Sequence, residues 1–313
     1  MRQKTFNEEM QEMFGGKVYR LSLSTGCTCP NRDGTVSTGG CIFCSAGGSG
    51  EFSQSGCLPV SDQIELAKQL VEKKISKNCA GYMAYFQSFT NTYGPCEKLR
   101  ELFQEALSHP EIRALSVATR PDCLPDDIVS MLSELNREKP VYVELGLQTM
   151  HEDTAVLLNR GYPLSVFEDA FRRLNKAGLR VVVHLIIGLP GEDEKKILET
   201  AAYLAGGAGS AHAVPDGIKL QILQVLKGTR LSEMEEKDPG ILPSYSLPEY
   251  AELVRKILSV LPETVTVHRL TGDPPKKLLI SPLWTADKKR VLNTLTAVLS
   301  GKEESRAPER NKL

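Results

Sequence analysis

The chain has 313 residues, of which 41% are hydrophobic and 25% charged, a composition typical of a globular protein with a sizeable core. Its 38 Lys and Arg residues nearly balance its 39 Asp and Glu residues, which excludes a strong overall charge that would attract nucleic acid or an anionic membrane. Neither a signal-peptide core nor a run of about 20 apolar residues is present, so we expect a cytoplasmic protein without a membrane partner, whose eight cysteines stay reduced or bind a metal.

Beyond residue 16, runs rich in β-branched residues, typical of strands, alternate with amphipathic runs typical of helices. The first strand is expected over 17–25, and the first helix over 61–75 with Ser61 as its N-cap. Five more strand and helix units are expected over 81–107, 114–136, 141–178, 179–205 and 217–258. The alternation predicts an α/β fold with a parallel sheet covered by helices. Six units are too few for a complete barrel and fit a partial barrel or an open doubly wound sheet.

A further strand over 264–274 and a helix capped by Thr285 and ended by Gly301 are expected after the sixth unit. We expect them to form a small C-terminal α/β appendage over 262–301. It would follow an N-terminal segment over 1–16 and the partial barrel over 17–261. The tail over 302–313 has almost no apolar residues and is expected to be disordered.

Four cysteines lie in the glycine-rich segment after the first strand, in the spacing Cys27-x-Cys29-x11-Cys41-x2-Cys44. A structural zinc site prefers two Cys-x2–4-Cys pairs, so the first pair is too closely spaced. A redox Cys-x-x-Cys pair normally begins a helix, whereas CIFC lies in a glycine-rich loop. Three thiolates can instead hold an iron–sulfur cluster and leave one iron open. A loop that follows the C-terminal end of a barrel strand favours a catalytic role.

Several motifs resemble those of the radical S-adenosylmethionine superfamily, in which a cysteine loop after the first strand also ends in Cys-x-aromatic-Cys. The matching segments are CPNRDGT and GGCIFC in the cysteine loop, YFQSFTNTYGP (85–95), ATRPDCLPD (118–126), VELGLQTMHEDTAVLLNRGY (143–162), HLIIGLPGED (184–193) and LQVLKGTRL (223–231). The first gap has eleven residues where the superfamily usually has three. This longer gap is similar to that of the YhcC/YtqA-like subgroup, which is related to the radical domain of the elongator catalytic subunit. The resemblance implies a partial (β/α)6 barrel.

The resemblance also implies that Cys29, Cys41 and Cys44 bind a [4Fe-4S] cluster, whereas Cys27 falls outside the motif. The open iron would bind S-adenosylmethionine, which the reduced cluster cleaves to methionine and a 5′-deoxyadenosyl radical. Such an enzyme needs an electron donor, expected to be a flavodoxin or a ferredoxin. Phe43 is expected to pack on the adenine of the cofactor, the alternative being packing within its own loop.

Further candidate cofactor-binding residues follow the second predicted strand. Gln87, Ser88 and Thr90 stand where the superfamily has a GGE motif. Their polar groups can bind an ammonium and a carboxylate by hydrogen bonds, or they can cap the next helix. In the next loop along the chain, Arg120 could bind a phosphate or brace that loop.

Glu144 and Gln148 span the end of a later strand and should point to the same face. If that face is the barrel interior, Glu144 needs a partner for its buried charge, and Arg160 is the expected one. The resemblance suggests that these three residues contact the ribose or methionine of the cofactor, the alternative being a structural ion pair. His184 lies in an apolar strand and is expected either to contact cofactor or substrate or to be hydrogen-bonded in the core.

Elongator-like radical domains act on the wobble uridine of transfer RNA at C5, so the resemblance implies a tRNA-modifying transferase. Local basic residues that could contact an RNA backbone are Lys276, Lys277, Lys288, Lys289, Arg290 and Arg269, although a solvated helix face is the simpler explanation. Two alternatives stay open: the same radical chemistry on a small molecule or a protein, and a non-enzymatic zinc or iron–sulfur module that binds RNA. No acetyltransferase domain is expected in a chain of this length, which leaves the carbon donor open.

Overall fold

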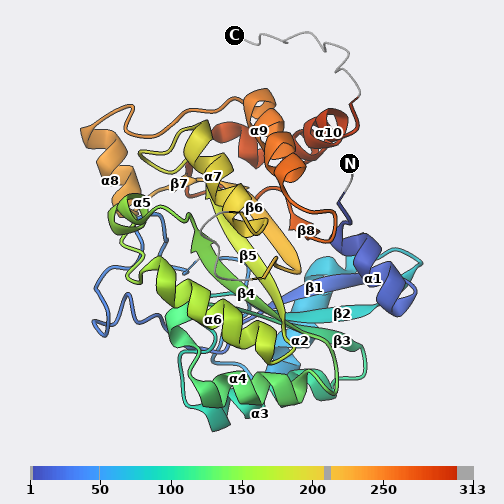
Figure 1. Cartoon of the computed structure of the whole chain (residues 1–313). Helices are drawn as coiled ribbons and strands as arrows, with labels where there is room; N and C mark the ends of the chain where they lie inside the picture. Colours follow the sequence, from blue (N-terminus) through green and yellow to red (C-terminus); the bar gives the residue numbers. More distant parts are fainter. Residues whose placement is uncertain (1–2, 49, 208–212, 302–313) are drawn as a thin grey trace.

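The computed structural model describes residues 3–48, 50–207 and 213–301. Its centre is a sheet of seven parallel strands in the order β1-β2-β3-β4-β5-β6-β8 (Figure 1). These strands are β1 (Lys17–Leu23), β2 (Cys79–Phe86), β3 (Ile112–Thr119), β4 (Val141–Gln148), β5 (Arg180–Ile187), β6 (Gly217–Ile222) and β8 (Thr266–Arg269). The predicted α/β partial barrel is confirmed. The tail over 302–313, expected to be disordered, lies outside the described residues.

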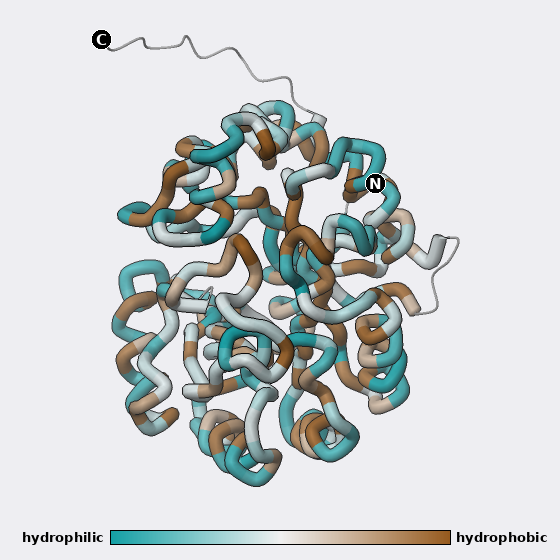
Figure 2. Tube along the Cα trace, turned by 90° about the vertical axis from the view of Figure 1, so that its left-hand side faces the viewer, coloured by the Kyte–Doolittle hydropathy of each residue, from teal (hydrophilic) through white to brown (hydrophobic). Residues whose placement is uncertain are grey.

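Helices that connect successive strands pack on the outer face of the sheet, where they share one apolar core with it. The helices are α1 (Phe6–Phe14), α2 (Val60–Val71), α3 (Cys96–Ser108), α4 (Asp126–Leu135), α5 (Glu152–Leu157), α6 (Leu164–Lys176), α7 (Glu194–Leu204), α8 (Arg230–Lys237), α9 (Leu247–Val260) and α10 (Lys288–Leu299), with 3-10 turns η1 (Glu72–Lys74), η2 (Pro121–Cys123) and η3 (Leu283–Ala286). Figure 2 shows hydrophobic and hydrophilic residues alternating along the outer helices, as amphipathic helices require.

The strand expected in the C-terminal appendage is β8, which pairs in parallel with β6 and extends the sheet to seven strands. The single strand expected over 217–225 is instead broken into β6 and a short β7 (Val225–Leu226), which leaves the sheet and pairs antiparallel with β9 (Leu279–Ser281). The division of the chain at residue 261 stays a prediction.

Two helix starts differ from the prediction. Helix α2 begins at Val60 with Pro59 as its N-cap, and the amide of Ser61 is bound by Glu105 Oε1 at 2.8 Å. Helix α10 is capped by Asp287, whose Oδ1 accepts from the Arg290 amide at 3.1 Å, whereas Thr285 lies in the preceding 3-10 turn. In both cases the side chain that accepts from an amide at the start of the helix is not the one that the sequence predicted. The predicted end of α10 is confirmed, since Gly301 has a φ of 67°.

The inner face of the sheet has two layers of different character, because side chains alternate between faces along a strand. The lower layer is apolar and consists of Val18, Met83, Ala114, Tyr142 and Val182, which pack against Phe6 and Met10 of helix α1. The next inward positions, toward the carboxyl ends of the strands, are polar: Arg20, Tyr85, Ser116, Glu144, His184 and Lys219. Helix α1 therefore closes the half-barrel at the amino ends of the strands. The six polar residues, called the polar floor below, form the base of the space at the carboxyl ends.

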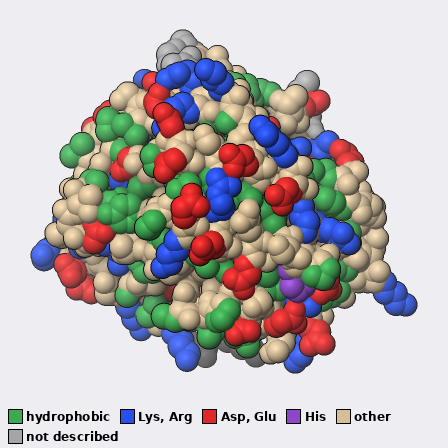
Figure 3. All heavy atoms as spheres, turned by 90° about the horizontal axis from the view of Figure 1, so that it is seen from below, with side chains coloured by type: hydrophobic (Ala, Val, Ile, Leu, Met, Phe, Trp, Pro, Cys, Tyr) green, Lys and Arg blue, Asp and Glu red, His purple; other side chains and the backbone are tan. Residues whose placement is uncertain are grey.

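The surface agrees with the balanced composition. On the face shown in Figure 3, acidic and basic side chains are interspersed rather than gathered by sign. Among the described residues, no helix combines the length and the apolar character needed to cross a bilayer.

Candidate functional site

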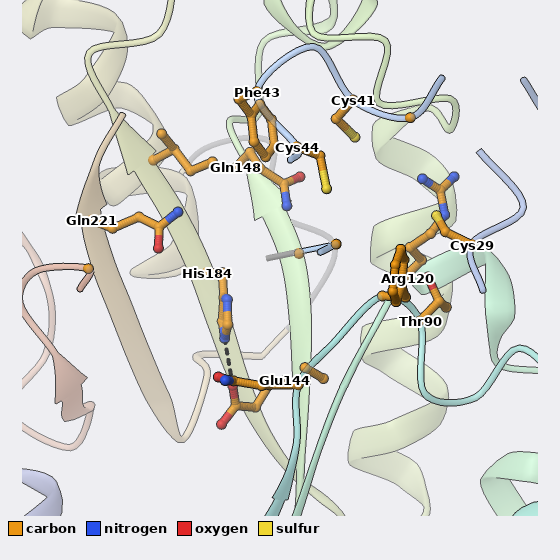
Figure 4. A pocket seen from close by; sticks show the side chains of 18 of the residues that line it. Cys29, Cys41, Phe43, Cys44, Thr90, Arg120, Glu144, Gln148, His184 and Gln221 are labelled. Atoms are coloured by element: carbon orange, nitrogen blue, oxygen red, sulfur yellow. Dashed lines mark hydrogen bonds and ion pairs between the residues drawn. The ribbon is translucent and has the colours of Figure 1, made fainter. Parts of the chain in front are cut away.

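A cavity opens at the carboxyl ends of the strands, and it brings together nearly all of the predicted site residues. It is lined by Cys29, Cys41, Phe43, Cys44, Gln87, Thr90, Glu144, Gln148, Arg160 and His184, and Figure 4 shows most of these side chains. Ser88 is the exception, because its buried hydroxyl donates to Ser24 Oγ at 2.8 Å and does not line the cavity. Segments more than 100 residues apart in sequence therefore meet in one space.

The cysteine loop is held in place by the turn that follows helix α5. Asn31, which is fully buried, donates through Nδ2 to Asn159 O at 2.6 Å, and Asn159 Nδ2 donates to Gly40 O at 2.9 Å. The Ile42 amide donates to Leu158 O at 3.0 Å. Asn159 has a φ of 53°, a left-handed conformation that Asn tolerates better than most residues. The loop is therefore fixed by backbone contacts on both sides of Cys41.

Three sulfur atoms face the cavity from different points of this loop: those of Cys29, Cys41 and Cys44. They are too far apart for a single ion, since among the described residues the one compact set of candidate ligands is the surface group Glu65, His109 and Glu111. A [4Fe-4S] cluster binds each thiolate at a different iron. The lack of a compact cysteine set among the described residues disfavours the zinc alternative, and the three thiols stay the predicted ligands of a cluster.

The environment of Cys41 is consistent with metal ligation. Burial raises the pKa of its thiol to about 12, so a thiolate there needs the charge of a metal to form at neutral pH. The Asn31 amide lies 3.6 Å from Cys41 Sγ, within reach of a hydrogen bond to sulfur. Hydrogen bonds to the sulfurs are one way in which proteins tune such clusters.

Cys27 lies outside the cavity. Its side chain packs against the apolar core of the outer face, where a Cβ added to Gly94 would lie 3.2 Å from Cys27 Sγ. This placement supports the prediction that Cys27 is not a ligand.

The expected ion pair between Glu144 and Arg160 is wrong. Arg160 is 1% exposed and donates to backbone oxygens instead, at 2.7 Å to Thr149 O, 3.0 Å to Leu147 O and 3.1 Å to Tyr162 O. These bonds fix the chain beside Gln148, which has a φ of 62°. Arg160 therefore shapes the cavity wall by holding backbone.

Arg120 is a cavity residue that is already paired within its own loop. Its Nε and Nη2 donate to the Asp122 carboxylate at 2.9 and 2.7 Å, and its Nη1 donates to Arg160 O at 2.9 Å. The ion pair with Asp122 raises the pKa of Arg120 despite its burial. This arrangement supports the bracing role that the sequence left open.

Glu144 is 1% exposed and is held by three partners from neighbouring strands. It accepts from Ser116 Oγ at 2.7 Å, from His184 Nε2 at 2.8 Å and, at shorter range, from Lys219 Nζ. Burial opposes its ionisation, but Lys219 and His184 together lower the pKa of Glu144 well below its usual value. The carboxylate is therefore ionised and acceptor-only.

Lys219 is a residue that sequence reasoning missed, as is the cavity residue Gln221 on the same strand. Lys219 is 2% exposed, and its ammonium lies 4.2 Å from the centre of the Tyr85 ring. Burial lowers its pKa to about 7 against the opposing effect of Glu144. Strand alternation was the available signal, because Lys219 shares the inward register of Gly217 and Gln221 in an otherwise apolar strand.

We expect stability to depend on pH through His184. Burial lowers the pKa of His184 to about 4 from an ordinary value of 6.5, so between these values the unfolded chain binds a proton that the folded chain does not. The free energy of unfolding should be unaffected by this group above pH 6.5 and fall by up to about 3 kcal/mol as pH is lowered toward 4. Urea titrations at several pH values would measure it, and the same decline in His184→Gln would contradict the assignment.

Comparisons with known proteins give a consistent result. A model of the Radical SAM superfamily matches residues 25–204, and a model of the Radical_SAM C-terminal domain matches residues 215–300. The chain is 42% identical to the uncharacterized protein YtqA of Bacillus subtilis, over 96% of this chain and 90% of that one. It is 33% identical to protein YhcC of Escherichia coli, over 90% and 87%.

Elongator complex protein 3 of Homo sapiens is 31% identical over 53% of this chain and 29% of its own length. Among solved structures, Elp3 of the archaeon Methanocaldococcus infernus has a TM-score of 0.62 at 19% identity; 84% of this chain is covered, which spans 58% of that one. Streptococcus suis SuiB bound to S-adenosylmethionine has a TM-score of 0.51 at 12% identity, covering 84% of this chain and 53% of its own. At these identities the two structures show a shared fold.

Proposed function

The chain belongs to the radical S-adenosylmethionine superfamily, and from this premise we propose that it modifies the wobble uridine of transfer RNA at C5. Membership of the superfamily implies a [4Fe-4S] cluster and S-adenosylmethionine as cofactors. When bound, the reduced cluster supplies the electron that cleaves S-adenosylmethionine to methionine and a 5′-deoxyadenosyl radical.

The residues of the cavity have distinct roles in this proposal. Cys29, Cys41 and Cys44 hold the cluster, and Phe43, which lies between two of them in sequence and lines the cavity, packs on the adenine. Gln87, Thr90 and Gln148 line the cavity nearby and offer polar groups to the ends of S-adenosylmethionine. Arg160 holds the backbone around Gln148. The carboxyl ends of the strands thus supply orientation, while the cofactors supply the chemistry.

The observation that carries the RNA proposal is the match to elongator complex protein 3, which extends over 169 residues. Basic residues at the cavity rim support it. Lys276 and Lys277 are exposed and directly follow Pro275, a lining residue, while the exposed Lys227 directly follows Leu226, which also lines the cavity. Lys288, also exposed, pairs at 2.5 Å with Asp273 of the rim. Such a rim can contact phosphates although the whole chain is nearly neutral.

Arg269, another basic residue considered from sequence, is not part of this rim, and no hydrogen bond or ion pair joins Lys289 or Arg290 to a lining residue among the described residues. Arg269 lines the inner wall of the cavity and donates through Nη2 to Gln221 Oε1. The proposal also includes an electron donor, a flavodoxin or a ferredoxin, that reduces the cluster.

We expect deletion of the gene to change the nucleosides of cellular tRNA. Mass spectrometry should show loss of one C5-substituted wobble uridine to background. Its precursor should accumulate, because the enzyme that modifies it is absent. The wild-type gene should restore the profile, and Cys41→Ala should not. An unchanged wobble-uridine profile would count against RNA as substrate and leave a small molecule or a protein in its place.

A further inference from the structure

The residues that line the cavity come from two ends of the sheet, one formed by β1 to β3 and the other by β5 and β6. The cysteines stand on the loop after β1, and Thr90 and Arg120 follow β2 and β3. His184 and Gln221 project from β5 and β6, toward the other end of the sheet. Figure 4 shows His184 and Gln221 across the cavity from Cys29 and Cys41. The β5 and β6 side of the cavity therefore lies away from the cysteine loop.

The hydrogen-bond polarity of His184 is fixed by its neighbours. Its Nε2 lies 2.8 Å from a Glu144 oxygen, and Glu144, ionised and acceptor-only, can only receive a proton there. Nε2 therefore carries the hydrogen, and the neutral ring keeps a lone pair on Nδ1. None of the described residues hydrogen-bonds to Nδ1, which lies on the cavity side of the ring in Figure 4.

The orientation of the Gln221 side-chain amide is also fixed by a neighbour, but here the group left available is a donor rather than an acceptor. Its Oε1 accepts from Arg269 Nη2, and because a guanidinium only donates, the amide cannot be reversed without losing that bond. Nε2 is left as a donor, and none of the described residues accepts from it. Figure 4 shows this nitrogen turned toward the cavity. His184 pairs in the sheet with Lys219, two residues before Gln221 on the same strand.

We propose that His184 Nδ1 and Gln221 Nε2 form a recognition pair for a ligand edge that presents an N–H donor beside a carbonyl acceptor. This inference rests on the proposed function, under which the edge is the imide of uracil: N3–H donates to His184 Nδ1 and an adjacent carbonyl accepts from Gln221 Nε2. His184 is then a substrate-binding residue, whereas Glu144, Lys219 and Arg269 are positioning residues that set the polarity of the pair. Base recognition through two hydrogen bonds of fixed direction excludes a base whose N3 carries no hydrogen.

The first arm of the test uses only the wild-type holoenzyme, loaded with cluster and S-adenosylmethionine under anaerobic conditions. Its Kd is measured by fluorescence anisotropy for a synthetic anticodon stem-loop with uridine at the wobble position, and for the same RNA with N3-methyluridine there. We expect the methyl group to weaken binding about tenfold or more, since it removes the donor and blocks the acceptor. N3-methyluridine at another loop position is the matched control and should change Kd less than about twofold.

The second arm uses variants. His184→Phe and Gln221→Leu should each bind the uridine RNA about tenfold more weakly and lose most of the difference between the two wobble RNAs. His109→Phe and Gln104→Leu, on the outer surface, are the matched controls and should keep it. RNA-independent formation of 5′-deoxyadenosine should stay within about twofold of wild type in the two control variants, His109→Phe and Gln104→Leu, and it is measured in all four variants.

Equal binding of the uridine and N3-methyluridine RNAs by the wild-type enzyme would overturn the recognition pair. So would a severe loss of RNA-independent 5′-deoxyadenosine in both variants, which would assign the two residues to the cofactor. Either result leaves the proposed function standing, because that is judged separately by the tRNA nucleoside profile of the deletion strain. If His184→Phe does not fold, Gln221→Leu and the first arm still decide the matter.

Discussion

Cys29→Ala, Cys41→Ala and Cys44→Ala are each expected to lose the iron–sulfur cluster, while Cys27→Ala keeps it. The three sulfurs face one cavity, and removal of any of them leaves two thiolates for a cluster that is held by three. Cys27 faces the apolar core instead. After anaerobic reconstitution, iron and sulfide content and visible absorbance should fall to background in the first three variants. Reductive formation of 5′-deoxyadenosine should fall by more than about 100-fold, since even loss of an outer-shell partner costs up to that much.

Cys27→Ala is the matched control for this series, because it removes a thiol from the same loop without touching the cavity. We expect its cluster content and 5′-deoxyadenosine formation to equal those of the wild-type protein. Cluster loss in this variant would show that Cys27 is a ligand and that the assignment of the other three is incomplete. A colourless wild-type protein with one zinc per chain would contradict the cluster altogether.

Lys219→Met is expected to destabilise the fold by about 3–5 kcal/mol. The substitution leaves the Glu144 carboxylate, 1% exposed, without its cation and keeps only the hydrogen bonds from Ser116 and His184. A buried charge that loses its partner keeps the full cost of desolvation. Equilibrium urea unfolding at neutral pH, followed by circular dichroism, measures the change.

Two further variants make this prediction specific. Lys68→Met removes a lysine whose partners Glu65 and Glu111 are exposed, and it should cost no more than about 1 kcal/mol. The double variant Glu144→Gln with Lys219→Met removes both charges and should recover much of the stability lost in the single variant. If Lys219→Met cost no more than Lys68→Met, the polar floor would not contain a buried ion pair.

Much of this architecture could be predicted from local sequence. Strands and helices followed from periodicity, and the position of the cysteine loop after the first strand placed it at the carboxyl edge of the sheet. Helix caps were less predictable, because Ser61 and Thr285 have the right chemistry, but Glu105 and Asp287 are the side chains that accept from amides at the starts of these two helices. Caps depend on which polar group is nearest in space, and sequence gives only the candidates.

The sequence by itself determined the chemistry that the protein holds: three thiols in one glycine-rich loop, and polar residues at the strand ends that now line one cavity. The tertiary structure alone decided which of these groups meet. Glu144 pairs with Lys219, 75 residues away, rather than with Arg160 as expected. Strand register brings inward positions of β4, β5 and β6 together, whereas a local pattern records only that each faces inward. For the same reason, the hydrogen-bond directions of His184 and Gln221 are set by charged residues on other strands, Glu144 and Arg269.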